Sequence, residues 1–291
     1  MENRIKKYRE ELNLKEAVFT LIDHDHTMIA LVYRVTQLDG TSLILKISSE
    51  EEDYRRELYF LRYLEKKYPS PLLLDSIEPH SNIYGAILME CFEGDLLQER
   101  DWSDSLAFEI GANLAKLHTN RTAAYGDLIR EKTLLFSSRE YFEKKFKEEL
   151  SECMSHFSVS LIEKIQSYFD AHSHYLDKVD GPCIVHRDFR PGNIIVNQGK
   201  LQGIIDWASA RSGFAEQDLC TMIHPKYKKS LLEGYRSIRK VPKYELVMPL
   251  LQLSRALAVI GYAIKSNTWN SSNRDIYIRN CRFLELFNFS L

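Results

Sequence analysis

The residues best suited to do chemistry lie between positions 183 and 207. A carboxylate (Asp188), a carboxamide (Asn193) and a second carboxylate (Asp206) follow one another there on polar segments framed by short apolar runs. A phosphoryl group in transfer spreads negative charge over its oxygens, so hard cations on hard oxygen ligands stabilise it. One carboxylate could orient an attacking hydroxyl and accept its proton, while the amide and the other carboxylate hold magnesium against a nucleotide's phosphates. The pattern predicts phosphoryl transfer.

The spacing of these residues predicts a hairpin that positions them. Asn193 stands directly before the apolar residues 194–196, and Asp206 directly follows Ile205, with a turn signal at residues 197–200 between the two runs. Such a pattern is typical of two antiparallel strands joined by a tight turn. The adjacent strand ends would place Asn193 and Asp206 at the same rim, where one or two ions can bridge them.

The motif formed by these residues resembles that of a known family. His186-Arg-Asp188 through Asn193, an H-x-D-x-x-x-x-N run, followed by Ile-Asp206-Trp, is similar to the aminoglycoside phosphotransferase and choline kinase-like family of small-molecule kinases. Further blocks in the same order resemble a strand lysine, a helix glutamate, a hinge strand, the first helix of a larger lobe and a segment after the metal aspartate. They are residues 45–47, 56–58, 87–94, 114–118 and 213–219.

The resemblance implies a role for each matching residue. Asp188 would be the catalytic base, and Asn193 and Asp206 would bind Mg²⁺. Lys46 would pair with the inner phosphates of ATP, and Glu57 would hold Lys46. Without its neighbours Lys46 could equally be a strand-edge lysine whose head group reaches solvent.

The hinge is also assigned by resemblance. Met89 would lie behind the purine, Glu90 would offer its backbone carbonyl and Phe92 its backbone amide. Because the last two are backbone contacts, their side chains carry little information, and Met89 could simply belong to the core. ATP is the expected nucleotide, and GTP is not excluded.

The family implies an α+β, bilobal, protein kinase-like fold. A small antiparallel sheet with one helix would form an N-lobe for the nucleotide over residues 1–92. A larger, mainly α-helical C-lobe over residues 93–291 would carry the catalytic hairpin, the metal site and the acceptor pocket. Alternation predicts strands at 17–22, 28–36, 42–47, 72–74 and 84–91, and apolar spacing predicts helices around 54–64 and at 103–118, 139–155, 160–176, 226–237, 244–265 and 275–289.

Two residues of the motif region favour a structural interpretation. His186 is expected to pack and hydrogen-bond its own loop rather than take part in catalysis. Asp218 is expected to steady the catalytic loop. Arg187 is interpreted as a structural ion-pair partner or a contact to the transferred phosphate, and Trp207 after the metal aspartate is familiar in the small-molecule kinases.

Two features of the sequence bear on the substrates. The turn expected to cover the phosphates, residues 23–27, contains no glycine and two carboxylates, which predicts weak nucleotide affinity or a loop that moves on binding. Only residues 208–217 separate Trp207 from Asp218, which leaves no room for a long regulated loop or a peptide-binding segment. Protein substrates therefore rank low.

Composition excludes several classes of protein. The chain has 291 residues, 44% of them hydrophobic, and a formal charge of -2, which suits a globular protein and argues against nucleic-acid binding. The five cysteines are scattered without metal spacing, which favours a reduced, cytoplasmic protein. The charged N-terminus does not read as a secretory signal, and no run approaches the roughly 20 apolar residues of a membrane span.

The predicted function is transfer of the terminal phosphoryl group of ATP to a hydroxyl of a small molecule. An aminoglycoside-like antibiotic, which would make the protein a resistance enzyme, an amino alcohol and a sugar metabolite all remain open as acceptors. For a cationic acceptor, Glu216, Asp218 and Glu233 are available to form an acidic wall. The alternatives are a weak or inactive kinase-like nucleotide-binding module and an atypical protein kinase. The sequence does not predict an oligomeric state.

Overall fold

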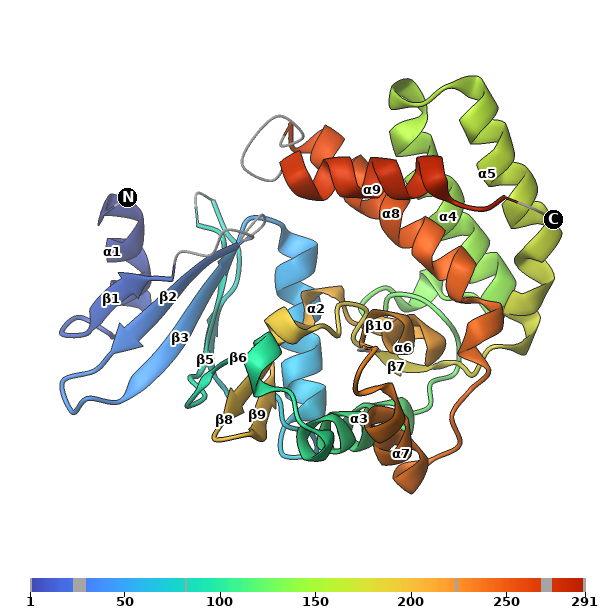
Figure 1. Cartoon of the computed structure of the whole chain (residues 1–291). Helices are drawn as coiled ribbons and strands as arrows, with labels where there is room; N and C mark the ends of the chain where they lie inside the picture. Colours follow the sequence, from blue (N-terminus) through green and yellow to red (C-terminus); the bar gives the residue numbers. More distant parts are fainter. Residues whose placement is uncertain (1, 23–29, 82, 223–224, 268–273, 290–291) are drawn as a thin grey trace. The chain divides into compact units, whose positions relative to one another are not determined.

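The computed structural model describes residues 2–22, 30–81, 83–222, 225–267 and 274–289, drawn as ribbon in Figure 1. Internal contacts divide the chain into two compact units, each built from several segments. Unit 1 comprises Met1–Leu117, His186–Ala210 and His224–Ile238, and unit 2 comprises His118–Val185, Arg211–Ile223 and Arg239–Leu291. The lobe boundary after residue 92 stays a prediction.

Unit 1 contains a five-stranded antiparallel sheet with the order β1-β2-β3-β5-β4. Alternating buried and exposed positions, as in β2, explain why these segments form strands with one face on a core. The predicted strands are all found, and the fourth extends further than expected. The bounds are β1 Val18–Leu21, β2 Ala30–Thr36, β3 Ser42–Ser48, β4 Leu73–Ile77 and β5 Gly85–Glu90.

Two helices accompany this sheet. Helix α1 (Glu2–Glu11) was not predicted, because its many charged residues hide the few apolar ones that face the sheet. Tyr8 of this helix and Leu12, just after its end, join Val35 and Leu45 in one buried cluster. Helix α2 (Glu51–Leu64) matches the predicted helix and buries Glu57 together with an apolar stripe.

The predicted hairpin is also part of unit 1. Strands β8 (Ile194–Asn197) and β9 (Lys200–Ile204) pair antiparallel with Ile194 opposite Ile204, and β6 (Asp95–Leu96) adds a third strand. Gly199 has φ of +73°, which a tight hairpin turn requires and glycine adopts without steric cost. Helices α3 (Asp104–His118) and α7 (Lys228–Ile238) complete the unit, apart from His118.

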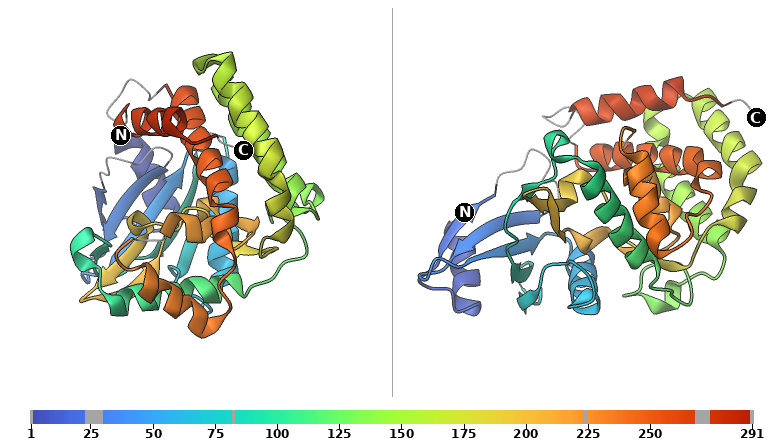
Figure 2. Two further views of the ribbon diagram at one scale, coloured as in Figure 1. Left: turned by 45° about the vertical axis from the view of Figure 1, so that its right-hand side comes forward. Right: turned by 60° about the horizontal axis from the view of Figure 1, so that its bottom comes forward.

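Unit 2 is mainly helical, as predicted for this part of the chain. Stacked aromatic rings at its centre, such as Phe146 and Phe169 with centroids 4.3 Å apart, pack with leucines of α8. Helices α8 and α9 run side by side (Figures 1 and 2). Short strands β7 and β10 and helix α6 were not predicted. The bounds are α4 Ser138–Cys153, α5 Val159–His172, β7 Cys183–Val185, β10 Arg211–Gly213, α6 Glu216–Met222, α8 Met248–Lys265 and α9 Arg274–Leu286.

None of the helices in the described ranges is long and apolar enough to cross a membrane. The longest is the amphipathic α8, whose apolar side faces the core of unit 2.

Candidate active site

The predicted site residues all fall in unit 1, although they come from distant parts of the sequence. Strand β3 and helix α2 supply one pair, the end of β5 supplies the hinge residues, and the segments flanking the β8–β9 hairpin supply the rest. The set is Lys46, Glu57, Met89, Glu90, Phe92, Asp188, Asn193 and Asp206.

Lys46 lies between two carboxylates. Its Nζ is 2.6 Å from Oε2 of Glu57 and 2.8 Å from Oδ1 of Asp206. The Glu57 side chain is 1% exposed and that of Asp206 is 41% exposed. Strand β3, helix α2 and the end of β9 thus meet at one ammonium group, and the pairing expected between Lys46 and Glu57 is present in the structure.

Lys46 and Asp206 each favour the charged form of the other. Burial disfavours the ammonium of Lys46, but the carboxylates of Asp206 and Glu57 more than offset this and raise its pKa. The neighbouring Lys46 lowers the pKa of Asp206, whereas burial raises that of Glu57. Asp206 is therefore an ionised, partly exposed oxygen donor, the kind of group that binds a hard cation.

The backbone at Asp206 adopts an unusual conformation. Its φ of 66° and ψ of 68° place it in the left-handed region, which costs a non-glycine residue roughly 1 kcal/mol. The next residue, Trp207, is fully buried and holds the turn: its Nε1 donates to the carbonyl of Ile204 at 2.9 Å, and its ring stacks on Phe60 of α2. Local packing thus offsets the strain and aims the Asp206 carboxylate.

Arg56 ties α2 to the same segment. Its guanidinium, on a residue only 3% exposed, donates through Nη1 to the carbonyl of Ala208 at 2.8 Å and to Oδ1 of Asp53 at 2.9 Å. Consecutive residues of α2, Arg56 and Glu57, therefore reach Ala208 and Lys46. Helix α2 therefore fixes the segment that follows Asp206 as well as the lysine.

Asp188 and Asn193 are held together on the loop before β8. The amide Nδ2 of Asn193 donates to Oδ2 of Asp188 at 2.7 Å and to its backbone carbonyl at 2.9 Å. Because the amide nitrogen is committed to Asp188, the carbonyl oxygen Oδ1 of Asn193 is directed away from that residue and can serve a cation. Arg190 also donates to the Asp188 carboxylate through Nε, at 3.0 and 3.1 Å from its two oxygens.

His186 connects this loop to the segment before Asp206 through hydrogen bonds. Its ring is completely buried, 4.5 Å from the Trp207 ring between centroids. Nδ1 accepts the backbone N–H of Asp188 at 3.3 Å, and Nε2 donates to the carbonyl of Ile205 at 3.0 Å. A neutral imidazole protonated on Nε2 satisfies both bonds. The geometry fits the structural role expected for His186.

The three residues predicted for the hinge lie at the end of strand β5 or just after it. Met89 is 5% exposed and lies opposite Ile44 of β3. The Glu90 carboxylate accepts the backbone N–H of Leu72 at 3.1 Å, so this side chain braces the sheet edge. The Phe92 ring covers Gly203, where a Cβ would approach it to 2.0 Å. Their predicted contacts to a purine stay predictions.

The residues present fit a magnesium ion. The donors are the Asn193 carbonyl oxygen and the Asp206 carboxylate, and Oδ2 of Asp206 has no hydrogen bond to any described residue. Within the described ranges, no group of three or more His, Cys, Asp or Glu side chains could hold a metal by itself. A site with two hard oxygen donors suits an ion that takes its remaining ligands from phosphates and water, as Mg²⁺ does.

The structure corrects the expectation of an acidic wall. Glu216 is 2% exposed and accepts the backbone N–H of Asp180, while Asp218 is fully buried against His118 at 3.1 Å. Neither carboxylate faces solvent, because the backbone and histidine partners that satisfy them lie inside unit 2. Glu233, half exposed near Lys229, is a solvated helix residue. The suggested role of Asp218 in steadying the catalytic loop stays a prediction.

Two charged residues of this region were missed. Arg190 lies at an unspecified position of the H-x-D-x-x-x-x-N run and was given no role, and its place two residues after Asp188 was the available signal. Arg56 stands next to Glu57 but reads from sequence as an ordinary surface arginine. The glycine-free turn at residues 23–27 lies outside the described residues.

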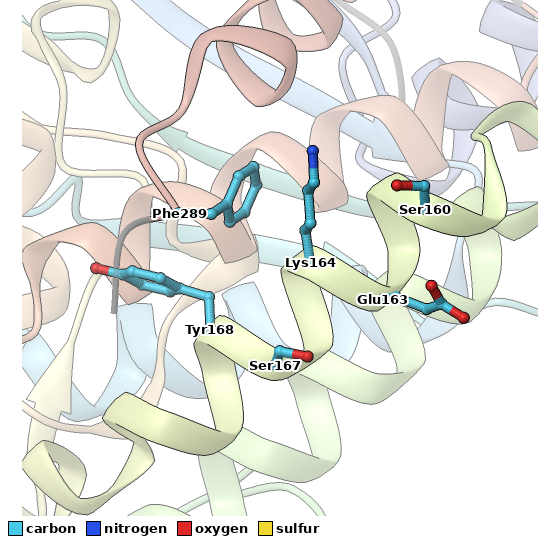
Figure 3. A pocket seen from close by; sticks show the side chains of 6 residues that line it. All are labelled: Ser160, Glu163, Lys164, Ser167, Tyr168 and Phe289. Atoms are coloured by element: carbon cyan, nitrogen blue, oxygen red, sulfur yellow. The ribbon is translucent and has the colours of Figure 1, made fainter.

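A cavity of about 380 Å³ lies in unit 2, away from these residues in sequence (Figure 3). Lys164 and Tyr168 of α5 project toward Phe289 there, beside two serines and Glu163 (Figure 3). No residue of the predicted site lines this cavity.

Several solved structures share the fold over almost the whole chain. The complex of gentamicin with APH(2")-IIa has a TM-score of 0.68 at 16% identity and covers 97% of this chain and 96% of its own. A putative fructosamine-3-kinase from Thermobifida fusca YX-ER1 gives 0.66 at 19% identity, covering 92% and 93%. The amicoumacin kinase hAmiN, in complex with AMP-PNP, Ca²⁺ and Ami, gives 0.64 at 17% identity, covering 99% of both chains.

These likenesses confirm the predicted α+β, protein kinase-like fold. A comparison with proteins of curated function yields no match. A family model described as the phosphotransferase enzyme family matches residues 21–243, a range that contains every predicted site residue. Because this match spans most of the sequence, the chain belongs to the phosphotransferase enzyme family.

Proposed function

We propose that the protein transfers the terminal phosphoryl group of ATP to a hydroxyl group of a small molecule. The observation that carries the proposal is the convergence of Lys46, Glu57 and Asp206 at one ammonium group. Such an arrangement serves a nucleotide's phosphates and their metal ion. Family membership supports the reaction class, and the acceptor and the catalytic base are the proposed parts.

Asp188 would act as the base. Its side chain is 30% exposed, and Asn193 and Arg190 fix its orientation. The acceptor hydroxyl would donate its proton to Asp188 as its oxygen forms a bond to the terminal phosphorus, while the bond from that phosphorus to the leaving oxygen of ADP breaks. Positioning of the hydroxyl is most of the required catalysis, because the transition state is loose.

Lys46 would bind the inner phosphates, and Glu57 would keep the ammonium in place. Asn193 and Asp206 would hold Mg²⁺, which supplies neutralising charge to the phosphate oxygens. Met89, Glu90 and Phe92 would line the nucleotide's base, which leaves GTP as an alternative to ATP. The nucleotide lobe would comprise residues 1–92, and residues 93–291 would hold the acceptor pocket in a cytoplasmic protein.

A small acceptor is favoured by the short path between the two buried residues Trp207 and Asp218. Similar structures contain gentamicin or are described as kinases for fructosamine or amicoumacin, which supports an antibiotic, amino alcohol or sugar. Glu216 and Asp218 no longer support a cationic acceptor, because both carboxylates are buried.

The test is a screen of nucleotide consumption and thermal stability over aminoglycosides, macrolides, choline, other amino alcohols and sugars. A true acceptor is expected to accelerate magnesium-dependent ADP formation and to raise the melting temperature by mass action. Asp206→Ala should abolish consumption while the protein stays folded. Labelling of a protein, but of no small molecule, by the terminal phosphate would instead support an atypical protein kinase.

An inactive nucleotide-binding module is the rival function, and the glycine-free turn at residues 23–27 is the observation that favours it. Such a module should bind nucleotide yet form no ADP with any acceptor of the panel. Phosphoryl transfer that disappears in Asp206→Ala would exclude it.

A further inference from the structure

Arg190 contacts the proposed base in a way that leaves most of its guanidinium unused. Only Nε donates to Asp188, at 3.0 Å from Oδ2 and 3.1 Å from Oδ1. Within the described part of the chain, Nη1 and Nη2 have no hydrogen-bond partner, and the side chain is 37% exposed. A guanidinium has five N–H donors in a planar fork, so four of them remain for a ligand.

The loop itself fixes the position of the Arg190 guanidinium. A Cβ at Gly192 would lie 2.3 Å from Nη1 of Arg190 and 3.2 Å from its central carbon, so the guanidinium rests directly on the glycine backbone. Any larger residue at position 192 would displace it. Arg190 and Asn193 both donate to the Asp188 carboxylate, so the guanidinium lies on the loop that carries the proposed base and one proposed metal ligand.

We propose that Arg190 binds the phosphoryl group undergoing transfer through Nη1 and Nη2 while its Nε orients Asp188. This inference rests on the proposed function and assigns that site a further cation, one that no matching block indicated. A planar fork with two parallel donors matches the oxygens of a phosphate. The same guanidinium thus spans the proton acceptor and the phosphoryl group, and fixes the distance between them.

The alternative is a local ion pair between residues 188 and 190 that only stiffens the loop. Two features of the structure argue against it. A stiffening contact would use the bidentate face of the guanidinium, whereas Arg190 uses Nε alone and leaves Nη1 and Nη2 open. Asp188 is moreover already oriented by Asn193 at 2.7 Å.

The first experiment measures nucleotide binding and needs no acceptor. Dissociation constants of the magnesium complexes of AMP-PNP and ADP are compared in the wild type and in Arg190→Gln. Loss of charge-assisted hydrogen bonds to the terminal phosphoryl group should reduce the preference for AMP-PNP over ADP by roughly 10-fold or more, with ADP affinity nearly unchanged. An exposed arginine of α2 that pairs with Glu51 provides the matched control, Arg55→Gln, in which the preference should not change.

The second experiment uses turnover with an acceptor from the screen. Arg190→Gln should lower kcat by about 100-fold with little change in the acceptor KM. Gly192→Ala should lower kcat through displacement of the guanidinium, and the double variant should be no worse than Arg190→Gln alone, because both changes remove one interaction. Added guanidinium ion should partly rescue Arg190→Ala, an effect that mere loop stiffening does not produce.

The outcomes separate this inference from the proposed function. An unchanged preference for AMP-PNP over ADP in a folded Arg190→Gln protein overturns the role of Arg190, whatever the acceptor. Additive losses in the double variant overturn it as well. Absence of nucleotide binding in the wild type overturns the proposed function, and the inference with it, whereas transfer by the wild type with normal kcat in Arg190→Gln overturns the inference alone.

Discussion

In unit 1 the carboxylate of Asp206 pairs with Lys46 through one oxygen, whereas in unit 2 both oxygens of Asp180 pair with arginines. Oδ1 of Asp180 accepts from Arg121 at 2.5 Å, and Oδ2 accepts from Arg239. Its backbone N–H donates to Glu216 at 3.0 Å. Both networks combine carboxylates with cations, yet among the described residues only the first leaves a carboxylate oxygen, Oδ2 of Asp206, without a hydrogen bond.

The two networks differ in whether a carboxylate oxygen remains available to a ligand. A carboxylate whose oxygens are both taken by arginines is stabilised in one geometry and contributes to the fold, although removal of its charge leaves cations unpaired. The Asp206 side chain is instead 41% exposed, and its Oδ2 has no hydrogen bond to any described residue; the side chains of Asp188 and Asp180 are 30% and 23% exposed. Residue types alone do not distinguish a structural ion pair from a reactive one. We call the network of Lys46, Glu57 and Asp206 open, because one oxygen of Asp206 has no hydrogen bond to a described residue, and the network of Asp180 closed. Substitutions in each can show whether the two have separate functions.

The largest effect is expected for Asp188→Asn. The amide is isosteric but cannot accept the hydroxyl proton, so kcat should fall by roughly 10³-fold. Nucleotide affinity, measured by calorimetry, should stay nearly intact because the proposed role of Asp188 involves the acceptor hydroxyl and neither the nucleotide's base nor its inner phosphates. Loss of nucleotide binding in a folded variant would reassign Asp188 as a metal ligand.

Asp180→Asn should show the opposite behaviour. Its charge is removed between two arginines, Arg121 and Arg239, so the free energy of unfolding should fall by roughly 3 kcal/mol in a urea titration. The kcat of the folded protein should stay near that of the wild type. A variant that loses activity but keeps its stability would break the distinction between the two networks.

Glu57→Gln tests how far the open network depends on its buried member. Lys46 keeps Asp206 as a partner but loses the carboxylate 2.6 Å away, so the ammonium becomes less firmly placed. The nucleotide KM should rise by about 10-fold, with a smaller effect on kcat. Glu51→Gln on the exposed side of the same helix is the control, and an equal effect there would contradict a specific role for Glu57.

The smallest effect concerns pH and Glu216, which belongs to the closed network. Burial raises the pKa of Glu216 from 4.5 to about 7. Between these values the unfolded chain loses the proton while the folded protein keeps it, so stability should fall as pH rises from about 4.5 to about 7.

Glu216→Gln removes this titration but keeps an oxygen for the N–H of Asp180. The variant should match the wild type at pH 4.5 and exceed it in unfolding free energy at pH 8, by on the order of 1 kcal/mol. Thermal melts at the two pH values measure the difference. A variant less stable than the wild type at pH 8 would show that the carboxylate, rather than the acid, stabilises the fold.

The sequence predicted the β8–β9 hairpin, but not helix α1 of the same unit. Short apolar runs joined by Asn197 to Lys200 specify a tight hairpin by themselves, and their register places Asn193 and Asp206 at one rim. Helix α1 escaped prediction because few of its residues are apolar, and its packing on the sheet depends on strands far along the chain. The three residues of β7 are too short to give a periodic signal.

The sequence by itself determined the order and the chemical types of the site residues and the local hairpin, because strand alternation and turn chemistry are short-range properties. The pairing of Lys46 with Asp206, 160 residues apart, was decided by the tertiary structure. So was the burial of Glu216 and Asp218, which look like surface acids in sequence. The tertiary structure also showed that Nη1 and Nη2 of Arg190 have no hydrogen bond to the described residues. Sequence cannot show this, since desolvation and the direction of a side chain depend on the residues packed around it.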